Sequence, residues 1–522
     1  MKSRTRVAAL TAVVSLGLAG LIGTASAATP SQTTHTARIK VTGIDRNGHK
    51  TAVFATIMGT NYAPIYTTGN AVSVPKGPAW VGAEVDTTTG SQHLLASATL
   101  VMRRVTISRS KTIVLNARGG KLVKFSLGVP GAQETGEIAQ ACVGGEFAAG
   151  APVEAGEIAT PLYVVPVRAK GFSFGYASTW QTAKASYLIS GQRGGGIPST
   201  PHFRATPAGL AKVQMTLRTG ETVGQYEDIR VIRQTSCGVQ QFLPVDNPDG
   251  ESFAQYVSAG TYVIWTDGDR AFWLHTLRLA ARHSYSDTYG AAAFGPGQDF
   301  PTVWEHEFQF QSATPMADPQ HNSSACCDVS SMTLSYRGHV VKHAVQSQYR
   351  QDREFTVHLP SASPAWYTLR VVAWRHTPGA KVPASILSSR VSLYWHFRTS
   401  PEPGVPLDAK LVPVTTTRFV PRGLNLENQA PPGASTVVAV SVVRPAASSD
   451  ISPPKYRLRR VQVQASVNGG KTWRTVHLVK HGGYWLATVP DPASGYVALR
   501  STVVDSHGDK SVETIYRAYA IR

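Results

Sequence analysis

Short stretches in which apolar and polar residues alternate, separated by tight turns, run along most of the chain. Ala37 to Val41, Ala52 to Ile57 and Tyr367 to Trp374 are examples, and residues 45–48 form a turn between the first two. Alternation over four to eight residues predicts strands with one buried face. Helical spacing is convincing almost nowhere, and the best candidate, residues 270–282, fits a strand equally well. We therefore predict an all-β protein made of several consecutive β-sandwich modules.

The chain has the length and composition for several hydrophobic cores. Of its 522 residues, 42% are hydrophobic and 16% are charged, which excludes a disordered polypeptide. Residues 131–159, rich in Gly, Ala and Glu, are interpreted as a linker or an irregular start of a domain, and residues 401–406 as another boundary. We expect a signal peptide over residues 1–27, an N-terminal β-sandwich over 28–130, β-rich middle domains over 131–300 and 301–400, and a C-terminal β-sandwich over 401–522.

The last module shows the clearest sandwich pattern. Apolar and polar residues alternate from Val461 to Val467, and further strand-like segments follow up to Ile521. Seven or so short strands in about 110 residues predict an immunoglobulin-like or fibronectin-III-like sandwich. Residues 466–473 also resemble the Asp-box hairpin of sialidases, with Asn468 in place of the Asp. Because this motif occurs once, we interpret it as a hairpin stabiliser and not as a sign of glycan cleavage.

The first 27 residues have the pattern of a signal peptide. Lys2, Arg4 and Arg6 precede an apolar run from Val7 to Ile22, and Ala25-Ser26-Ala27 is a small-x-small cleavage site. A retained N-terminal anchor is the alternative, but polar residues typical of a mature start follow the site at once. No later stretch reaches the roughly 20 apolar residues of a membrane span. We expect cleavage near Ala27 and a secreted, extracellular protein with no membrane partner after cleavage.

The charge is strongly basic and constrains the partners. The chain carries 51 Lys and Arg against 32 Asp and Glu, a net charge of +19, and loss of the three basic residues of the signal leaves +16. Such a surface favours an anionic cell-wall polymer or polysaccharide through salt-sensitive attraction. The alternative is that the charges are spread over several domains and serve solubility. The densest basic cluster is only Arg457 to Arg460, so no specific nucleic-acid partner is expected.

Four cysteines are disulfide candidates, namely Cys142, Cys237, Cys326 and Cys327. After export they meet an oxidising environment, where bonded pairs are the default. Three connectivities are possible, and the sequence does not choose among them. His321 and Asp328 lie near the adjacent pair, but no repeated C-x-x-C spacing supports a metal site. We therefore expect no metal.

The motifs of common catalytic classes are missing. The sequence has no G-x-S-x-G elbow, no P-loop and no H-E-x-x-H zinc motif, and Gly194 to Gly196 lacks the flanks of a phosphate loop. Residues 304–310 alternate perfectly and predict one strand, with Glu305 and Glu307 on one face as solvated acids. Paired carboxylates assembled in space are the alternative that sequence leaves open. We expect no catalytic residue and no cofactor.

The C-terminal half resembles a known type of region. The segments are residues 289–296, residues 389–400 with Trp395-His396-Phe397-Arg398, and Arg418 to Pro421, while residues 495–519 match best. They are similar to the non-catalytic region that follows the peptidase domain in large secreted subtilisin-like serine peptidases of actinobacteria. Residues 74–77 and 116–118 extend the resemblance upstream, although Asn116 stands where that pattern prefers Asp. The resemblance implies an exported β-rich appendage without the peptidase domain, and it transfers no active site.

Three functional hypotheses follow. The first is a secreted, non-catalytic binding or scaffolding protein of the cell exterior, and it rests on the signal peptide, the strand-rich modules and the basic charge. The second is a secreted glycoside hydrolase with a spatially assembled carboxylate site between residues 160 and 400, where His275, His283 and His306 accompany several acids. The third is an accessory or partner of a secreted protease, for which only the resemblance speaks.

Overall fold

A computed structural model describes most of the chain after residue 34. The described residues are 35–59, 62–89, 94–153, 160–218, 228–234, 240–245, 252–268, 271–297, 300–311, 316–325, 329–347, 354–401, 410–444 and 457–522. Within these ranges the structure contains strands and two 3₁₀ turns, η1 (Ala117–Gly119) and η2 (Pro207–Gly209), and no α-helix. The predicted all-β class is therefore confirmed. No helix in the described part of the chain is long and apolar enough to cross a bilayer.

Two sheets pack together in the N-terminal region around a core of alternating residues such as Ile39, Val41, Val81 and Leu115. The first sheet contains β2 (Lys50–Thr51), β1 (Thr36–Ile44), β5 (Val72–Pro75) and β8 (Lys111–Asn116). The second contains β4 (Ile65–Thr67), β3 (Ala55–Gly59), β6 (Gly77–Thr89), β7 (Leu94–Ile107), β13 (Leu162–Val164) and β9 (Lys121–Leu122). Since β13 pairs with β7, a strand from beyond residue 131 completes the sheet of the first expected module.

Three sheets form the middle region. The largest contains β12 (Glu146–Val153), β11 (Gln133–Val143), β14 (Val167–Gln181), β15 (Ala185–Ile197), β20 (Ser252–Val257), β17 (Ala211–Leu217) and β23 (Ser284–Tyr289). A second contains β19 (Gln240–Val245), β18 (Asp228–Gln234), β21 (Gly260–Gly268), β22 (Ala271–Leu279) and β26 (Asn322–Ala325), and a third pairs β10 (Lys124–Leu127) with β16 (His202–Ala205). Residues 270–282, which fitted a helix or a strand, therefore supply the strand β22.

The segment 131–159, expected as a linker or an irregular start, contains the hairpin β11–β12. Its strands are rich in buried alanines, among them Ala139, Ala141 and Ala151, which belong to the core between the first and middle regions. A strand covered on both faces does not alternate between apolar and polar residues. This double burial explains why the sequence pattern did not predict the hairpin.

One nine-stranded sheet dominates the C-terminal region. It contains β28 (His339–Ser347), β27 (Val329–Tyr336), β30 (Ala365–Trp374), β31 (Arg390–Thr399), β41 (Lys510–Ile521), β40 (Gly495–Asp505), β36 (Leu458–Ser466) and β37 (Arg474–Val476), with β34 (Gln429–Ala430) beside β41. Because β31 pairs with β41, strands from the expected 301–400 and 401–522 modules share this sheet. One hydrophobic core, from Ala292 to Ile521, also takes residues from both segments.

Two four-stranded sheets cover this large sheet. One contains β33 (Thr416–Pro421), β35 (Ser435–Val443), β39 (Tyr484–Pro490) and β38 (Leu478–His481). The other contains β29 (Glu354–His358), β25 (Glu307–Gln311), β24 (Thr302–Trp304) and β32 (Lys410–Leu411). The prediction of one strand over residues 304–310 is wrong, because Trp304 pairs with Glu307 across a tight turn. Glu305 has a φ of 52° in that turn, a conformation that breaks the extended run despite the perfect alternation.

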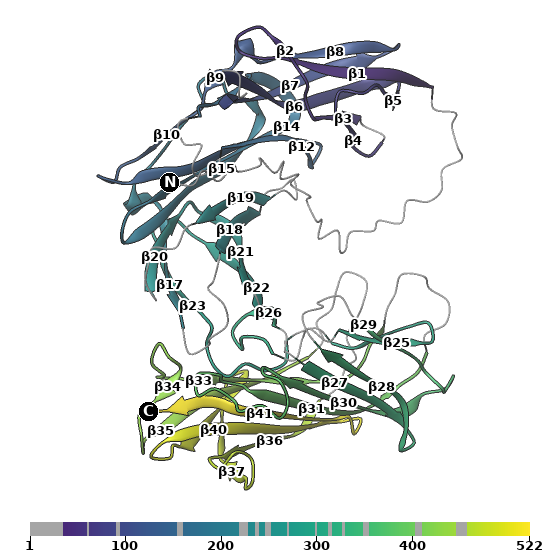
Figure 1. Ribbon diagram of the computed structural model, residues 1–522, viewed down its shortest axis with the longest axis vertical. Coiled ribbons are helices and arrows are strands. Elements are labelled where there is room, and N and C mark those ends of the chain that lie inside the picture. Colours follow the sequence, from purple (N-terminus) through teal and green to yellow (C-terminus); the bar gives the residue numbers. More distant parts are fainter. Residues whose placement is uncertain are drawn as a thin grey trace, which may run out of the picture.

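Figure 1 shows the strands in two groups along the long axis of the molecule. The purple, blue and teal strands of the N-terminal and middle regions form one group, and the strands from β27 to β41 form the other. The chain first passes from the first group to the second after β23, and it returns once to place β26 beside β22. The loop that follows β23, residues 290–297, is buried almost throughout, so the two groups meet through a packed junction.

Candidate functional site

A row of large side chains crosses the nine-stranded sheet where β30 ends and β31 begins. Trp374 is directly opposite Arg390, and Arg390 is directly opposite Tyr516 on β41. Directly opposed residues on neighbouring strands have their side chains on the same face, within contact distance. The guanidinium carbon of Arg390 lies 3.7 Å from the centre of the Tyr516 ring, so the cation stacks on the aromatic face.

A bulge in β41 adds a second arginine to the same face. The register between β40 and β41 shifts between Val497 and Leu499, and Arg517 has a φ of 54°, a region that L-residues rarely occupy. In a regular strand, consecutive side chains point to opposite faces. The bulge allows both Tyr516 and Arg517 to line one hollow, and such re-aiming of a side chain is a common role of bulges near functional sites.

One loop, between β30 and β31, holds the second arginine and its aromatic partner. The Arg517 guanidinium lies 4.4 Å from the centre of the Tyr496 ring and donates to the carbonyl of Pro383 at 2.7 Å. The hydroxyl of Tyr496 donates to the carbonyl of Ala384 at 2.7 Å. These bonds fix the loop between β30 and β31 against the start of β40, so the positions of Arg517 and Tyr496 are set before any ligand arrives.

The hairpin that resembles an Asp box forms the far wall. Asn468 accepts from the backbone N–H of Thr472 at 3.0 Å and donates to its hydroxyl at 2.8 Å. Ser466 Oγ accepts from the N–H of Gly470 at 2.9 Å. Asn468 therefore closes the turn as the Asp of such a hairpin would, and this agrees with the structural role predicted for it. Val467, at the turn, is 53% exposed.

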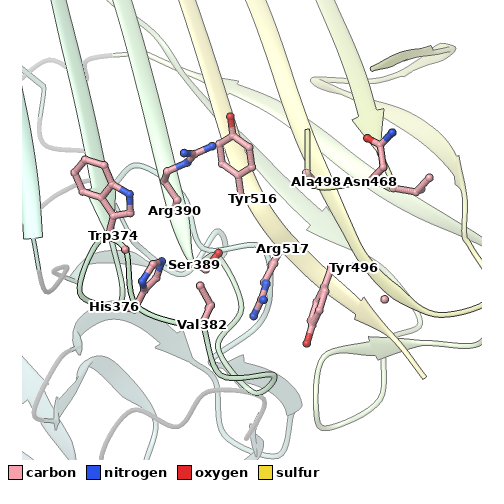
Figure 2. A pocket seen from close by; sticks show the side chains of 14 residues that line it. Trp374, His376, Val382, Ser389, Arg390, Asn468, Tyr496, Ala498, Tyr516 and Arg517 are labelled. Atoms are coloured by element: carbon pink, nitrogen blue, oxygen red, sulfur yellow. The ribbon is translucent and has the colours of Figure 1, made fainter. Parts of the chain in front are cut away.

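Together these elements enclose a groove of about 560 Å³, which we call the arginine groove. Figure 2 shows its lining, with Trp374, Arg390 and Tyr516 along the strands and Arg517 and Tyr496 across from them. Its lining residues are Trp374, His376, Gly379, Val382, Ser389, Arg390, Val467, Asn468, Gly469, Gly495, Tyr496, Ala498, Tyr516 and Arg517. None of these fourteen described residues is acidic. The groove is therefore cationic and aromatic, a combination suited to an anionic ligand with flat apolar faces.

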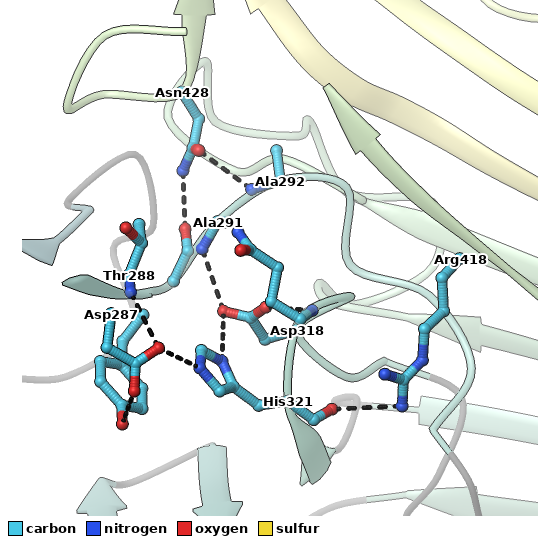
Figure 3. Close-up of polar contacts among 11 residues, drawn as sticks. Asp287, Thr288, Ala291, Ala292, Asp318, His321, Arg418 and Asn428 are labelled. Carbon is cyan, nitrogen blue, oxygen red and sulfur yellow. Dashed lines mark hydrogen bonds and ion pairs between the residues drawn. The ribbon is translucent and has the colours of Figure 1, made fainter. Parts of the chain in front are cut away.

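A second polar cluster lies at the junction between the two groups of strands, and we call it the buried histidine cluster (Figure 3). His321 is 1% exposed. Its Nε2 atom lies 3.1 Å from Oδ1 of Asp287, and its Nδ1 atom lies 3.3 Å from Oδ2 of Asp318. The Tyr289 ring stacks on the imidazole with 4.4 Å between the ring centres. A carboxylate at each ring nitrogen favours the doubly protonated imidazolium.

Backbone and side-chain donors complete the buried histidine cluster. Asp318 accepts from the N–H groups of Ala291 at 3.1 Å and Gln320 at 2.8 Å, and Asp287 accepts from the hydroxyl of Tyr289 at 2.7 Å. Burial alone would lower the pKa of His321, but its bonds to the two aspartates and their charges outweigh burial and raise the pKa to about 9. The imidazolium is thus neutralised inside the protein and closed to a ligand.

Further bonds tie this cluster to both groups of strands. Asn428 donates to the carbonyl of Gly290 at 2.8 Å and accepts from the N–H of Ala292 at 2.9 Å. Arg218, at the end of β17, donates to Asn428 at 3.2 Å. Residues more than 200 positions apart in the sequence therefore meet here. These hydrogen bonds connect the two groups of strands at the junction, which is a structural role.

The structure separates the residues of the carboxylate-based hypothesis. His283 precedes β23 and bonds to the carbonyl of Ala281, whereas His306 lies in the β24–β25 turn and stacks on His358. Glu305 and Glu307 are both exposed on that hairpin. The side chain of His275 lies outside the described part of the structure. His283 and His306 therefore lie next to strands of different sheets.

Among the disulfide candidates, only Cys142 falls within the described residues. It lies in β11, is 3% exposed and is disulfide-bonded. Cys237, Cys326 and Cys327 lie outside the described residues, as does Asp328. The three possible connectivities therefore stay a prediction.

The sequence did not predict the arginine groove. Its residues come from three separate segments, around 374–390, 467–469 and 495–517, and each segment alone reads as a strand or a turn. The one available signal was Arg517 between two aromatic residues, Tyr516 and Tyr519. That signal has no specificity without the register that brings Trp374, Arg390 and Tyr516 into one row.

Comparison with known proteins gives no family. No family model matches the chain, and no curated protein matches it. Solved structures with partial similarity include the TIE protein of Bacillus anthracis, at 9% identity over 66% of this chain and 70% of that chain with a TM-score of 0.14. A Salmonella alpha-2-macroglobulin variant has 10% identity over 90% of this chain and 37% of that chain, with a TM-score of 0.17. Escherichia coli alpha-2-macroglobulin activated by porcine elastase has 9% identity over 90% of this chain and 50% of that chain, with a TM-score of 0.16. These TM-scores are too low to support an argument about function.

Proposed function

We propose that this protein is a secreted, non-catalytic binding or scaffolding module of the cell exterior, and that the arginine groove holds an anionic polymer. The observation that carries the proposal is the pairing of two arginines with two tyrosines in a groove lined by no acid. The ligand class is a wall polymer or polysaccharide that bears phosphate or carboxylate groups. The signal-peptide pattern of residues 1–27 and the resemblance to subtilase accessory regions support the exterior location.

The chemistry of the groove suits such a ligand. A guanidinium presents a planar fork of donors that matches phosphate and carboxylate oxygens. Stacking of Arg390 on Tyr516 and of Arg517 on Tyr496 limits the motion of both cations, so less side-chain entropy is lost on binding. Trp374 offers a flat surface for a sugar ring beside them. The strongly basic chain adds long-range attraction that brings a polyanion to the surface.

The carboxylate-based hydrolase receives no support from this groove, since such an enzyme needs two acids about 5 to 10 Å apart across the scissile bond. A role as partner of a secreted protease rests on the resemblance alone. Co-purification of an exported subtilase with this protein would support that second role.

Binding of the mature protein to purified cell wall, chitin, cellulose and nucleic acid would test the proposal. We expect retention on anionic wall polymer at about 50 mM NaCl and release at about 500 mM, because screening weakens charge contacts. Neutral chitin and cellulose should retain little. No retention on any anionic polymer at low salt would contradict the proposal.

Variants locate the contact. Arg390→Ala combined with Arg517→Ala should reduce retention on the wall polymer by at least tenfold. Arg370 provides a matched control, because it lies on the same sheet beside a tyrosine, 5.3 Å from the Tyr394 ring centre, and does not line the groove. Equal losses in both variants would show that general basic charge, and not the groove, carries the binding.

A further inference from the structure

The turn between β40 and β41 gathers three side chains that bind metals elsewhere in proteins. Asp505, His507 and Asp509 each place one potential ligand atom within 4.8 Å of the others. Asp505 is 2% exposed and Asp509 is 7% exposed, while His507 is exposed. Two carboxylates are therefore held inside the protein under an imidazole that reaches solvent.

Backbone donors hold one oxygen of each carboxylate. Oδ1 of Asp505 accepts from the N–H of His507 at 2.8 Å and from the N–H of Asp509 at 3.0 Å. Oδ1 of Asp509 accepts from the N–H of Arg398 on β31 at 2.9 Å. Bonds of this kind orient metal-binding carboxylates from behind. Backbone donors therefore fix each acid through its Oδ1 atom.

The second oxygen of Asp505 is the observation that points to a ligand. Oδ2 of Asp505 is buried and accepts no hydrogen bond from an N–H or hydroxyl group among the described residues. The side chain beside the Asp505 carboxylate is the second carboxylate, that of Asp509, which lies within hydrogen-bond reach. A buried carboxylate oxygen without a partner costs free energy, because it has lost its water and gained nothing. A cation between Asp505 and Asp509 would remove that cost and separate the two like charges.

The chain contains a second turn that shows which parts of this arrangement the backbone requires. At residues 45–49 the N–H of Asp45 donates to the carbonyl of His49, and the N–H of Gly48 to the carbonyl of Asp45. Asp505, Gly508 and Asp509 make the same two bonds, and the first Asp accepts from the N–H of the fifth residue in both turns. The fifth residue is His49 in one turn and Asp509 in the other. The turn thus forms without a second carboxylate, so its geometry does not explain Asp509.

We propose that Asp505, His507 and Asp509 form a three-ligand site for a divalent transition-metal ion of the Zn²⁺ type. The mixed set of two carboxylates and one imidazole suits Zn²⁺, whereas Ca²⁺ and Mg²⁺ prefer oxygen ligands alone. The exposed side of His507 gives the ion an entry path and leaves a coordination position to solvent. The inference is independent of the arginine groove.

Calorimetric titration of the chelator-treated mature protein with ZnCl₂ tests this site. We expect one Zn²⁺ per chain with a dissociation constant in the micromolar range or tighter, and a rise in melting temperature on addition of Zn²⁺. Asp505→Asn keeps an acceptor for the turn and should abolish binding. His507→Ala, at an exposed position, should weaken binding at least tenfold without affecting folding.

Asp45→Asn in the matched turn is the control and should leave Zn²⁺ binding unchanged. If Asp505→Asn does not fold, the His507→Ala variant decides. The proposal is overturned if the wild-type protein binds no Zn²⁺ up to about 1 mM, a limit that corresponds to a negligible affinity. It is equally overturned if His507→Ala binds Zn²⁺ as tightly as the wild type, since any ion would then lie elsewhere.

Discussion

The arginine groove and the buried histidine cluster both gather charged and aromatic side chains, yet they differ in access and in charge balance. In the groove, Arg390 and Arg517 stack on tyrosines and face a hollow lined by no acid. In the cluster, His321 stacks on Tyr289 and has a carboxylate at each ring nitrogen. The same pairing of cation and ring therefore occurs in both places, with opposite electrostatic outcomes.

The role of a polar cluster follows from its access to solvent and its charge balance. In a buried cluster whose charges are paired within the protein, the side chains stabilise the fold and are not accessible to a ligand. A solvent-accessible cluster with an excess of charge of one sign has unpaired charges, and binding of a ligand of the opposite sign is electrostatically favourable. This distinction predicts that substitutions in the cluster change stability, whereas substitutions in the groove change binding.

The largest expected effect is on stability, from Asp318→Ala. This change leaves the His321 imidazolium with one carboxylate and removes the acceptor of the Ala291 and Gln320 N–H groups. Loss of one partner of a buried ion pair costs about 3 to 5 kcal/mol. The loss in the free energy of unfolding is measured by urea denaturation, monitored through tryptophan fluorescence. Binding of wall polymer by the folded fraction should stay unchanged, and a stable variant that loses binding would break the distinction.

The next effect is the pH dependence of stability. The bonds of His321 to Asp287 and Asp318 overcome burial and raise its pKa to about 9 from 6.5. Since the folded-state pKa is the higher one, this stabilisation is complete below about pH 6.5 and is lost as the pH rises through 9. It corresponds to about 3 kcal/mol. Unfolding free energies measured from pH 6 to 10 should fall in the wild type, and the fall should be smaller in Asp318→Ala.

A smaller effect is expected at Glu513, near the same junction, where a substitution should raise stability and not lower it. Burial raises the pKa of Glu513 to about 8, although its bond from the Thr417 N–H and the charge of Arg418 act against this. Folding therefore favours the protonated acid, and this contribution to stability is lost as the pH rises from about 4.5 to 8. Glu513→Gln keeps the acceptor and should be more stable than the wild type by about 1 to 3 kcal/mol at pH 8. The difference should vanish near pH 4, and equal stabilities at pH 8 would contradict it.

The smallest effect concerns the groove, where free energy changes in binding and not in folding. Arg390→Ala should weaken retention on anionic polymer about tenfold, equivalent to about 1.4 kcal/mol, with a melting temperature close to that of the wild type. Arg390→Lys keeps the charge but loses the planar stack on Tyr516, so it should restore only part of the binding. Full restoration by Lys would show that charge alone matters.

The strands were predictable from the sequence where one face is buried and the other is exposed to solvent. Residues 461–467 and 367–374 alternate, and all of them except Val467 lie in strands of the nine-stranded sheet. Prediction failed for the alanine-rich hairpin β11–β12, which is covered on both faces, and for the turn at Glu305, whose positive φ interrupts a perfect pattern. Alternation in the sequence indicates a strand with one buried face. It indicates neither a strand that is buried on both faces nor a local change in backbone conformation.

Neither polar site could be predicted in the same way. Arg390 and Tyr516 are 126 positions apart and meet only because β31 pairs with β41 in one register. The bulge at Arg517 places its side chain in the same groove as Tyr516, and a shift by one residue would send it to the other face. His321 was noted beside the adjacent cysteines, whereas its partners Asp287 and Asp318 came from the folding of the junction.

The all-β class and the net basic charge follow from the amino-acid sequence alone, because alternation and composition are local properties that need no partner. The sequence also carries the signal-peptide pattern on which the expectation of export rests. The folded structure is needed to tell which charges are neutralised and which remain open to a ligand. That outcome depends on strand order and register, and these are set by long-range contacts between segments whose sequences do not reveal one another.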